Sequence, residues 1–446
     1  MGILYLISYV RERIDGIQIS YLEGNLTINE HISRVQEIKP DLYFISFTSF
    51  LSNLSFEVIK KIKDDNPAIT IICGGSQPTI NPEEVLQNGA DICVIGEGEI
   101  TAYELIKHYF NESDTNLSSI FGIVYKNDEK IFHTKKRSLI KNLDSIPFPA
   151  WDLVDMKKYP QDHFSKSHPR ANIIVSRGCP YNCNFCSNPV WKVNKPWLRL
   201  RSPKNIADEI QYLYNIGIRE IYLYGDEFNP VPKWSIDVCE EIKKLGYKDL
   251  YFQTILHANK VNDDLSKALN DINCWLVKIG IESGNQSTLD KINKKITLEQ
   301  VRDACKSLKK YDIKIYGFFM AFHIWEENGH LCNETPEETI NTLDFAHDLL
   351  ANNLIDYISW GFTTPIPGSQ LYNTCLKYNA IDPKFKMSKW DKTLVHLDID
   401  NKVMQSIKRK GMLLQARYNV LNGLRDCGLR YINISHWLTK LIHIMK

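Results

Sequence analysis

The sequence has almost no net charge and no apolar run long enough for a membrane. Its 446 residues hold 54 Lys and Arg against 53 Asp and Glu, a formal charge of +1. Without a basic excess, nucleic acid is not expected as a partner. The apolar start, residues 2–10, is too short to span a bilayer and lacks the flanks of a signal peptide. We expect a cytoplasmic protein without a transmembrane segment, and a buried helix at its start.

The cysteines lack the pairing of a disulfide framework and of a zinc finger. Eleven of them, an odd number, are scattered along the chain, which suits a reducing compartment. Cys179, Cys183 and Cys186 form the only close group, Cys-x3-Cys-x2-Cys. A zinc site would need a fourth Cys or His at a matching spacing, and only His163 and His168 precede the triplet, in a segment broken by prolines. A non-enzymatic zinc-binding scaffold stays open as an alternative.

Three thiolates at this spacing favour an iron–sulfur cluster with one iron left open. Cysteine thiolates normally bind one iron each in a cubane cluster. The triplet, with Phe185 just before its third cysteine, resembles the signature of the radical S-adenosylmethionine (SAM) superfamily. The resemblance implies a [4Fe-4S] cluster on Cys179, Cys183 and Cys186, SAM on the open iron, and a reducing partner such as flavodoxin or ferredoxin. The SAM-derived radical would then abstract hydrogen from an unactivated carbon.

The sequence predicts an α/β protein of three parts and a linker. Strand and helix patterns predict an N-terminal doubly wound (Rossmann-like) domain over residues 1–144, a linker over 145–170, a partial (β/α)6 barrel over 171–375 and a C-terminal helical region over 376–446. Predicted strands cover residues 42–47, 69–73, 92–95 and 121–125, and in the barrel 172–176, 220–224, 250–255, 275–281, 314–320 and 357–362. Capping boxes at Thr297 and Thr335 open two of the barrel helices. The tail, residues 430–446, is expected to dock on the barrel, with a membrane-surface helix as the alternative.

The N-terminal domain resembles the cobalamin-binding domain that precedes the barrel in one large radical SAM subgroup. The resemblance rests on Gly74-Gly75 and on Gly96-Glu97-Gly98-Glu99, which follow two predicted strands. The first strand of that domain is missing, because the chain starts at its helix. The Asp-x-His-x-x-Gly motif is also absent, and Gln77 stands where a His is expected. We therefore expect a scaffold or recognition platform and leave cobalamin open as a cofactor.

In parallel barrels, the loops at the carboxyl ends of the strands carry the chemistry. The family resemblance places a SAM amino-group contact after the second strand, a ribose or methionine contact in a Gly-Ile-Glu-Ser-Gly run after the fourth, and an adenine contact in a Thr-Pro-Ile-Pro-Gly run after the sixth. These expected cofactor-binding residues are Gly225, Asp226, Glu227, Glu282, Ser283 and Pro365, with Phe185 on the adenine face. For Phe185, a role in wedging the cysteine loop into the barrel is compatible with the contact.

The reaction depends on how the substrate radical is quenched. A thiol over the barrel mouth could return hydrogen and invert a stereocentre, as in peptide epimerases of the proteusin-maturing type. Cys332, in an unusually long loop over residues 321–332, and Cys375 are the candidate donors. We favour epimerisation of a ribosomally made peptide, because the cobalamin site looks incomplete. Cobalamin-dependent C-methylation of a peptide or natural product is the alternative.

Overall fold

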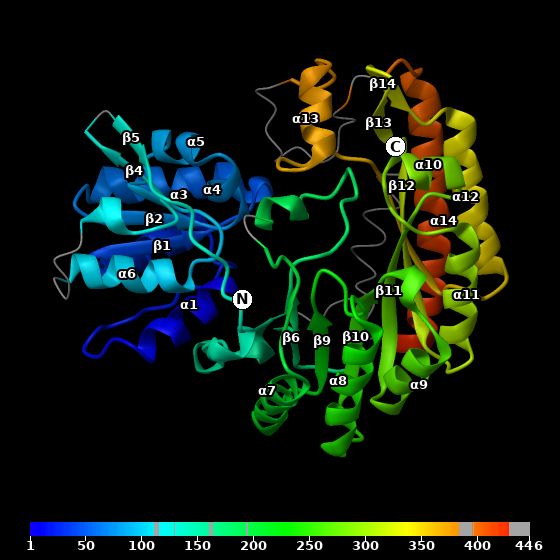
Figure 1. Cartoon of the computed structure of the whole chain (residues 1–446), viewed down its shortest axis with the longest axis horizontal. Helices are drawn as coiled ribbons and strands as arrows, with labels where there is room; N and C mark the ends of the chain where they lie inside the picture. Colours follow the sequence, from blue (N-terminus) through cyan, green and yellow to red (C-terminus); the bar gives the residue numbers. More distant parts are fainter. Residues whose placement is uncertain are drawn as a thin grey trace.

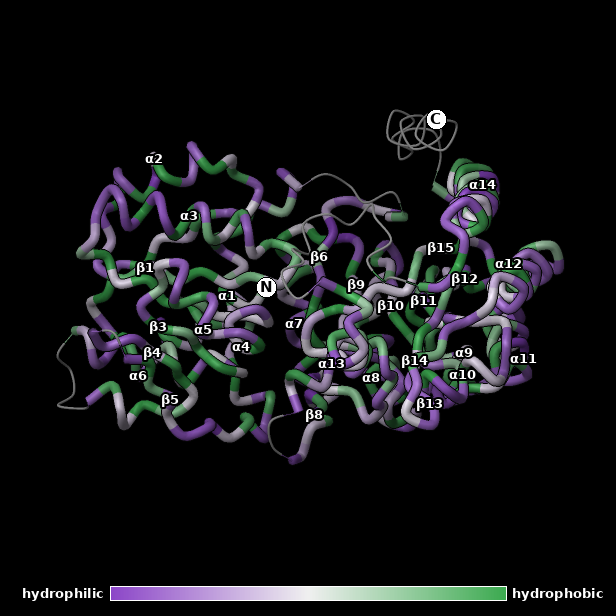
Figure 2. The backbone as a smooth tube through the Cα atoms, turned by 90° about the horizontal axis from the view of Figure 1, so that it is seen from above, coloured by the Kyte–Doolittle hydropathy of each residue, from purple (hydrophilic) through white to green (hydrophobic). Residues whose placement is uncertain are grey.

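The computed structural model describes residues 1–110, 116–128, 130–159, 164–192, 195–382, 395 and 397–427. Figures 1 and 2 show an N-terminal lobe with its own sheet beside a second, larger lobe built on a second sheet, with the more hydrophobic segments concentrated along the strands. The expectations for residues 430–446 lie outside the described part of the chain.

The N-terminal lobe is a five-stranded sheet in the order β1-β2-β3-β4-β5. Its first three strands are parallel and the last two antiparallel, an edge hairpin that the sequence did not reveal. Its strands are β1 (Leu42–Ser46), β2 (Thr70–Gly74), β3 (Ile92–Val94), β4 (Ile123–Asn127) and β5 (Lys130–His133). Its helices are α1 (Gly2–Arg11), α2 (Ile28–Ile38), α3 (Ser52–Asp65), α4 (Ser76–Ile80), α5 (Pro82–Gln87) and α6 (Glu99–Tyr109).

The apolar start of the chain forms α1, as predicted. Leu4, Ile7 and Val10 recur at the three-residue spacing of one helix face, and all three are buried. Val10 packs with Ile106 of α6. No strand precedes α1 within the described residues, and β1 is an edge strand of the sheet.

The second lobe contains six parallel strands in the order β15-β12-β11-β10-β9-β6, which confirms the partial barrel. Its strands are β6 (Arg170–Ile174), β9 (Glu220–Tyr224), β10 (Tyr251–Leu256), β11 (Cys274–Glu282), β12 (Lys314–Ala321) and β15 (Tyr357–Phe362). Its helices are α7 (Pro203–Asn215), α8 (Pro232–Lys244), α9 (Asp263–Asp271), α10 (Gln286–Lys291), α11 (Leu298–Lys309), α12 (Pro336–Ala351) and α13 (Gln370–Lys377). Each strand lies within two residues of its predicted position, and both capping boxes form.

Side chains alternate across the barrel strands, as the two-residue period of a strand requires. On β12, Ile315, Phe319 and Ala321 are buried in the core under the helices. Tyr316 and Phe318 face the other side of the sheet, and their ring centroids are 5.1 Å apart. The linker is tied to this lobe by Trp151, whose Nε1 donates to Glu209 of α7 at 3.0 Å. The domain boundaries at residues 144, 170 and 375 remain predictions.

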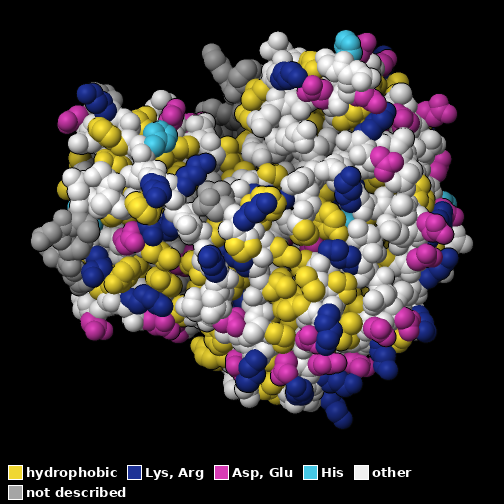
Figure 3. All heavy atoms as spheres, viewed as in Figure 1, with side chains coloured by type: hydrophobic (Ala, Val, Ile, Leu, Met, Phe, Trp, Pro, Cys, Tyr) yellow, Lys and Arg dark blue, Asp and Glu magenta, His cyan; other side chains and the backbone are white. Residues whose placement is uncertain are grey.

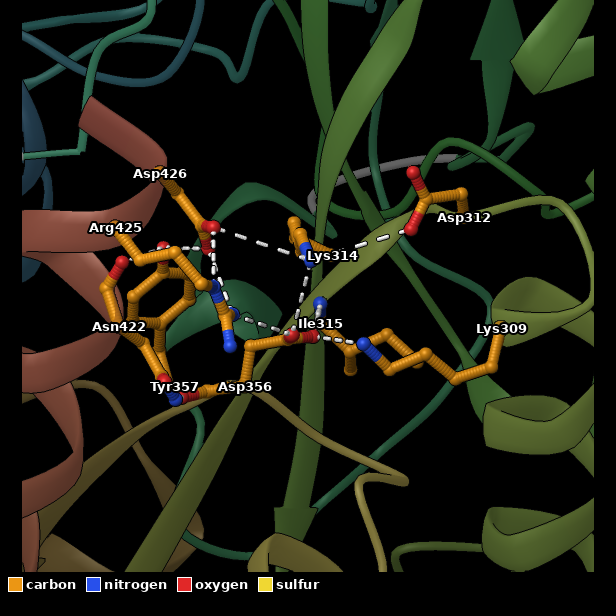
Figure 4. A network of polar contacts seen from close by, with 9 residues as sticks. All are labelled: Lys309, Asp312, Lys314, Ile315, Asp356, Tyr357, Asn422, Arg425 and Asp426. Atoms are coloured by element: carbon orange, nitrogen blue, oxygen red, sulfur yellow. Dashed lines mark hydrogen bonds and ion pairs between the residues drawn. The ribbon is translucent and has the colours of Figure 1, made fainter.

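A long helix, α14 (Asn401–Cys427), docks along β15 through a polar network. Figure 4 shows Asp356, just before β15, at the centre of this network. Its carboxylate pairs with Lys309, and its backbone carbonyl accepts from Asn422 of α14 at 2.5 Å. The Tyr357 hydroxyl donates to Asp426 at 2.5 Å. The network lies where β12 and β15 begin, at the end of the barrel opposite the expected active site.

The segment after β12, which we expected to be a long loop, contains a hairpin. Strands β13 (Ile324–Glu327) and β14 (His330–Asn333) pair antiparallel around an Asn328-Gly329 turn. Both turn residues have positive φ, 51° and 79°, as the turn of a two-residue hairpin requires.

Acidic and basic side chains are interspersed over the face of the molecule that Figure 3 shows. Among the described residues, no helix combines the length and apolar character that crossing a membrane requires.

Candidate active site

The three cysteines lie on one loop that leaves the first barrel strand. After β6 the chain forms a short strand, β7 (Ser176–Arg177), which pairs with β8 (Arg199–Leu200), and the cysteines fall between the two. Asn184 fixes the loop over the barrel mouth. Its backbone N–H donates to Ile292 at 3.0 Å, its carbonyl accepts from Leu371 at 2.8 Å, and its side chain donates to Ile324 O at 2.9 Å. The loop is thereby tied to the ends of three distant segments.

The cysteine thiols are free, partly exposed and protonated at neutral pH in the absence of metal. Burial raises the pKa of Cys179 to about 12 and that of Cys183 to about 11, and it also raises the pKa of Cys186. Binding a metal as thiolates would therefore release protons. Among the residues that the structure describes, no three Cys, His, Asp or Glu side chains converge on one point as a zinc ion requires. A cubane needs no such convergence, because each thiolate binds a different iron.

Two acidic residues of the loop after β9 face the cysteines. Glu227 is almost fully buried, and neither carboxylate oxygen has a hydrogen-bond partner among the described residues. Burial raises its pKa to about 7, against the opposing charge of Lys260, whose Nζ is 3.8 Å away. Burial also raises the pKa of Asp226. Gly225 is tightly packed, since a Cβ there would lie 2.5 Å from Ser176 Oγ. A buried carboxylate without a donor is an open place for an amino group.

Glu282, at the end of β11, is buried in a strained backbone conformation with φ of +69°. Its Oε1 accepts from Lys294 Nζ at 2.9 Å. The same Lys294 lies 6.0 Å from the Phe185 ring centroid, so the cysteine loop and the β11 loop share this cation. Glu282 is therefore a buried carboxylate rather than a surface one.

Ser283 has a different geometry from the SAM contact that we expected. It is fully buried, and its hydroxyl donates to Glu334 Oε1 at 3.0 Å rather than facing the mouth. Glu334 also accepts the backbone N–H of His323 at 3.0 Å, and His323 Nε2 lies 3.3 Å from the Glu282 carbonyl. The hydroxyl therefore supports the loop. Glu334 and His323 are both fully buried. His323 lies in the expected long loop and Glu334 just after it, and no local pattern in the sequence indicated their contacts.

The loop after β15 brings the two lobes together. Pro365 is buried in this loop. A Cβ at Gly368, whose φ is +87°, would lie 2.2 Å from Val190, just after the cysteines, and 3.1 Å from Ile80 at the end of α4. Phe185 packs partly buried against the barrel core and 6.0 Å from the His323 ring centroid, as expected for a wedge. The end of α4 in the N-terminal lobe thus abuts both the expected adenine loop and the cysteine loop.

The N-terminal lobe presents glycine-rich turns at the carboxyl ends of its parallel strands. A Cβ added at Gly74 or Gly96 would meet nothing within 4 Å, so backbone there is accessible to a ligand. Gly75, with φ of +96°, packs instead against Phe47. The Gln77 side chain is buried and donates to Glu84 at 2.8 Å, so it is engaged within the lobe.

The two thiols proposed as hydrogen donors lie on α13 and on the β13–β14 hairpin. Cys375 is fully buried in α13, in a small apolar cluster with Ile324 and Leu371. Cys332 lies on β14 opposite Trp325, and its Sγ is 3.9 Å from the His330 carbonyl. The apolar cluster that contains Cys375 packs against Phe185 of the cysteine loop.

Comparison with known proteins agrees with this arrangement. Residues 173–346 match the family described as the radical SAM superfamily, and residues 1–106 match the B12 binding domain. An uncharacterized methyltransferase of Pyrococcus horikoshii is 32% identical over 401 residues, covering 87% of this chain and 83% of that protein. The chain belongs to the radical SAM superfamily. It carries the B12 binding domain of that superfamily's cobalamin-linked members.

Two solved radical SAM structures share the fold. The radical SAM methyltransferase TsrM from Kitasatospora setae, with cobalamin and a [4Fe-4S] cluster bound, superposes with a TM-score of 0.67 at 15% identity, over 85% of this chain and 72% of that one. The cobalamin-dependent radical SAM enzyme OxsB, with aqua-cobalamin and SAM bound, gives a TM-score of 0.70 at 20% identity, over 93% of this chain and 63% of that one. At these identities the likeness shows the fold.

These findings correct one expectation. The peptide epimerase interpretation is wrong, because relatives such as the Pyrococcus horikoshii protein are described as methyltransferases and fit the C-methylation alternative better. Cobalamin, which the sequence left open as a cofactor, is supported by the match of residues 1–106 to the B12 binding family. The zinc-scaffold alternative is excluded by membership of the superfamily. The cofactors of this family arrangement are a [4Fe-4S] cluster, SAM and cobalamin, and the cluster chemistry requires a reductant.

Proposed function

We propose that the protein is a cobalamin-dependent radical SAM methyltransferase that methylates an unactivated carbon. The observation that carries the proposal is the contact between the two lobes at Gly368, where Ile80 of α4 meets the loop expected to hold adenine. The glycine turns that suit a corrin and the loops that suit SAM therefore open near one another. The 32% identity to the uncharacterized methyltransferase of Pyrococcus horikoshii also supports methyl transfer.

Each cofactor has residues that fit it. Cys179, Cys183 and Cys186 would bind the cluster as thiolates. Glu227 and Asp226 would receive the amino group of SAM, because Glu227 is buried with no hydrogen-bond donor of its own. Glu282, already charge-balanced by Lys294, would orient the ribose or methionine end through its second oxygen.

The cobalamin would lie on backbone rather than on a cobalt-ligating histidine. Gly74 and Gly96 leave room for the corrin at the carboxyl edge of the sheet. Gln77 is already hydrogen-bonded to Glu84 and is not free to ligate cobalt. This edge would therefore hold the ring through shape and backbone amide groups.

Bound together, the cluster and SAM supply a one-electron cleavage of the sulfonium, and cobalamin supplies a methyl carrier. The protein orients these groups and excludes water. The loop that carries Phe185 closes the mouth, held in place by Asn184. Glu334 keeps the β11 loop in register through Ser283. A flavodoxin or ferredoxin is the proposed electron donor.

The products of SAM distinguish methyl transfer from other radical chemistry. Protein reconstituted anaerobically with iron, sulfide and hydroxocobalamin is reduced in the presence of SAM, and the nucleosides are quantified by chromatography. A methyltransferase consumes SAM in two ways, giving S-adenosylhomocysteine when the methyl group leaves and 5′-deoxyadenosine when the sulfonium is cleaved reductively. Formation of 5′-deoxyadenosine with no S-adenosylhomocysteine would contradict methyl transfer.

A further inference from the structure

A buried ionic network joins the N-terminal lobe to the strand that leads into the cysteine loop. Arg177, the last residue of β7, donates through its two terminal nitrogens to Glu97 at 2.9 Å and to Glu99 at 2.5 Å. Arg199 of β8 donates to the same Glu97 at 2.8 and 2.9 Å. Two guanidinium groups of the barrel lobe thus face two carboxylates of the turn after β3, the turn that contains Gly96.

The four side chains are charge-balanced and shielded from water. Between 5% and 18% of each side chain is exposed. Burial alone would raise the pKa of Glu97, but Arg177 and Arg199 outweigh it and lower that pKa. Glu99 keeps one carboxylate oxygen without a partner among the described residues. Removing one member therefore leaves a buried charge uncompensated, which surface pairs do not do.

Arg177 lies two residues before Cys179, an expected cluster ligand, and the backbone between them is closely packed. Gly178 separates Arg177 from Cys179 and has φ of +89°. A Cβ at Gly178 would lie 1.9 Å from the Trp197 carbonyl oxygen, so the backbone there passes directly against the strand entering β8. A displacement of the Arg177 backbone would be passed on to Cys179, because a closely packed segment cannot absorb it.

We propose that Arg177 is a positioning residue, through which the Glu97–Glu99 turn of the cobalamin-type domain sets the place and the electrostatic environment of the cluster loop. The N-terminal domain then does more than bind its own cofactor. Its turn at Gly96 faces the corrin site on one side and fixes Arg177 on the other. A change in that turn would reach the cluster loop through the ion pairs of Arg177.

Two substitutions that break the same contact separate an electrostatic role from a merely structural one. Glu99→Gln leaves Arg177 with excess positive charge, which stabilises the more negative reduced cluster and raises its midpoint potential. Arg177→Gln leaves excess negative charge and lowers that potential. The matched control is Glu104→Gln, on the same helix α6, whose partner Arg137 belongs to the N-terminal lobe. Its cluster potential should equal that of the wild type.

The potentials are measured by redox titration followed by electron paramagnetic resonance, on protein reconstituted with the cluster alone. Opposite shifts in the two variants support the proposal. Shifts in the same direction, or none, overturn it. These measurements need neither cobalamin nor substrate, so their outcome is independent of the proposed methyl transfer.

Hydrogen–deuterium exchange of the apoprotein covers the case in which a variant fails to assemble the cluster. Amides of residues 177–187 should exchange about tenfold faster in Glu99→Gln and Arg177→Gln than in the wild type, because the loop loses its anchor. Arg177→Lys, which keeps the charge but not the two-pronged geometry, should show faster exchange with little change in potential. Unchanged exchange in this segment in all three variants would overturn the positioning role.

Discussion

The Glu282 carboxylate accepts a hydrogen bond from the Lys294 ammonium at 2.9 Å inside the barrel mouth, and both side chains are largely buried. Lys294 also lies over the Phe185 ring. The pair therefore links the strand-end loop expected to hold SAM with the loop that carries the cysteines. The pair stabilises the fold only while both side chains are present, because loss of one leaves the other charge buried without a partner.

Removal of Lys294 alone should be costly. Lys294→Met leaves the Glu282 carboxylate buried and unpaired, and we expect a loss of about 3 kcal/mol in the free energy of unfolding. The double variant Glu282→Gln/Lys294→Met removes both charges and should recover most of that loss. Chemical denaturation of the apoproteins measures both quantities. Equal stability of the single and double variants would contradict the coupling.

A measurement of SAM affinity distinguishes the role of Glu282 in binding SAM from its role in stabilising the fold. In the double variant the fold is restored but the carboxylate is missing, so SAM affinity should fall about tenfold or more. Iron content should stay at the wild-type value, because the thiolates are untouched. Calorimetry on reconstituted protein checks the affinity. Wild-type affinity in the double variant would show that Glu282 does not contact SAM.

Glu227 should give the stability of the apoprotein a specific pH dependence. Its pKa is raised by burial to about 7 in the folded state, so the folded protein holds its proton more tightly than the unfolded chain does. This contribution is present below the ordinary carboxyl pKa and is lost as the pH rises toward 7. Glu227→Gln should therefore flatten the fall in unfolding free energy between about pH 4.5 and 7. An unchanged slope in the variant would contradict the raised pKa.

Gly178 should tolerate no side chain. Gly178→Ala must place a Cβ against the Trp197 carbonyl oxygen and also adopt a left-handed backbone, so we expect loss of cluster assembly. Gly217→Ala is the matched control, since Gly217 has φ of +97° but open space around it. Iron and sulfide analysis after reconstitution compares the two. A full cluster in Gly178→Ala would show that the loop is looser than its packing indicates.

The thiols outside the triplet should be dispensable for the reaction. Cys332→Ala and Cys375→Ala should each retain the wild-type ratio of S-adenosylhomocysteine to 5′-deoxyadenosine, because methyl transfer needs no thiol hydrogen. Cys375→Ala should lose about 1 kcal/mol of stability from the small cavity that it creates. Cys183→Ala, by contrast, should abolish both products. Loss of product in Cys332→Ala without loss of the cluster would contradict this assignment.

Most of the fold was predictable from the sequence because its strands have clear periodicity and its helices have explicit start signals. The six barrel strands and the Thr297 and Thr335 caps follow from local patterns alone. The edge strand β5 and the β13–β14 hairpin were not predicted. Strand β5 is short and largely exposed, and the Asn328-Gly329 turn that marks the hairpin was read as part of a long loop.

Site residues that belong to a sequence motif could be predicted from the sequence. Residues whose role depends on contacts with distant parts of the chain could not. Cys179, Glu227 and Glu282 belong to recognisable runs. Glu334 and Asn184 act through partners far along the chain, Ser283 and Ile324, which no local pattern connects to them. The sequence left cobalamin open because Gln77 stands where a His was expected, although the glycine turns that suit the ring are present.

The most direct test of the account is whether the protein binds cobalamin and methylates it from SAM. Protein carrying the [4Fe-4S] cluster is incubated anaerobically with hydroxocobalamin, desalted, reduced, and given SAM with a deuterated methyl group; the corrin is then analysed by mass spectrometry. We predict about one corrin per chain after desalting and transfer of the CD3 group to the bound corrin. A protein that emerges free of corrin, or a corrin that never acquires the CD3 group while SAM is still cleaved to 5′-deoxyadenosine, would contradict a cobalamin-dependent methyltransferase.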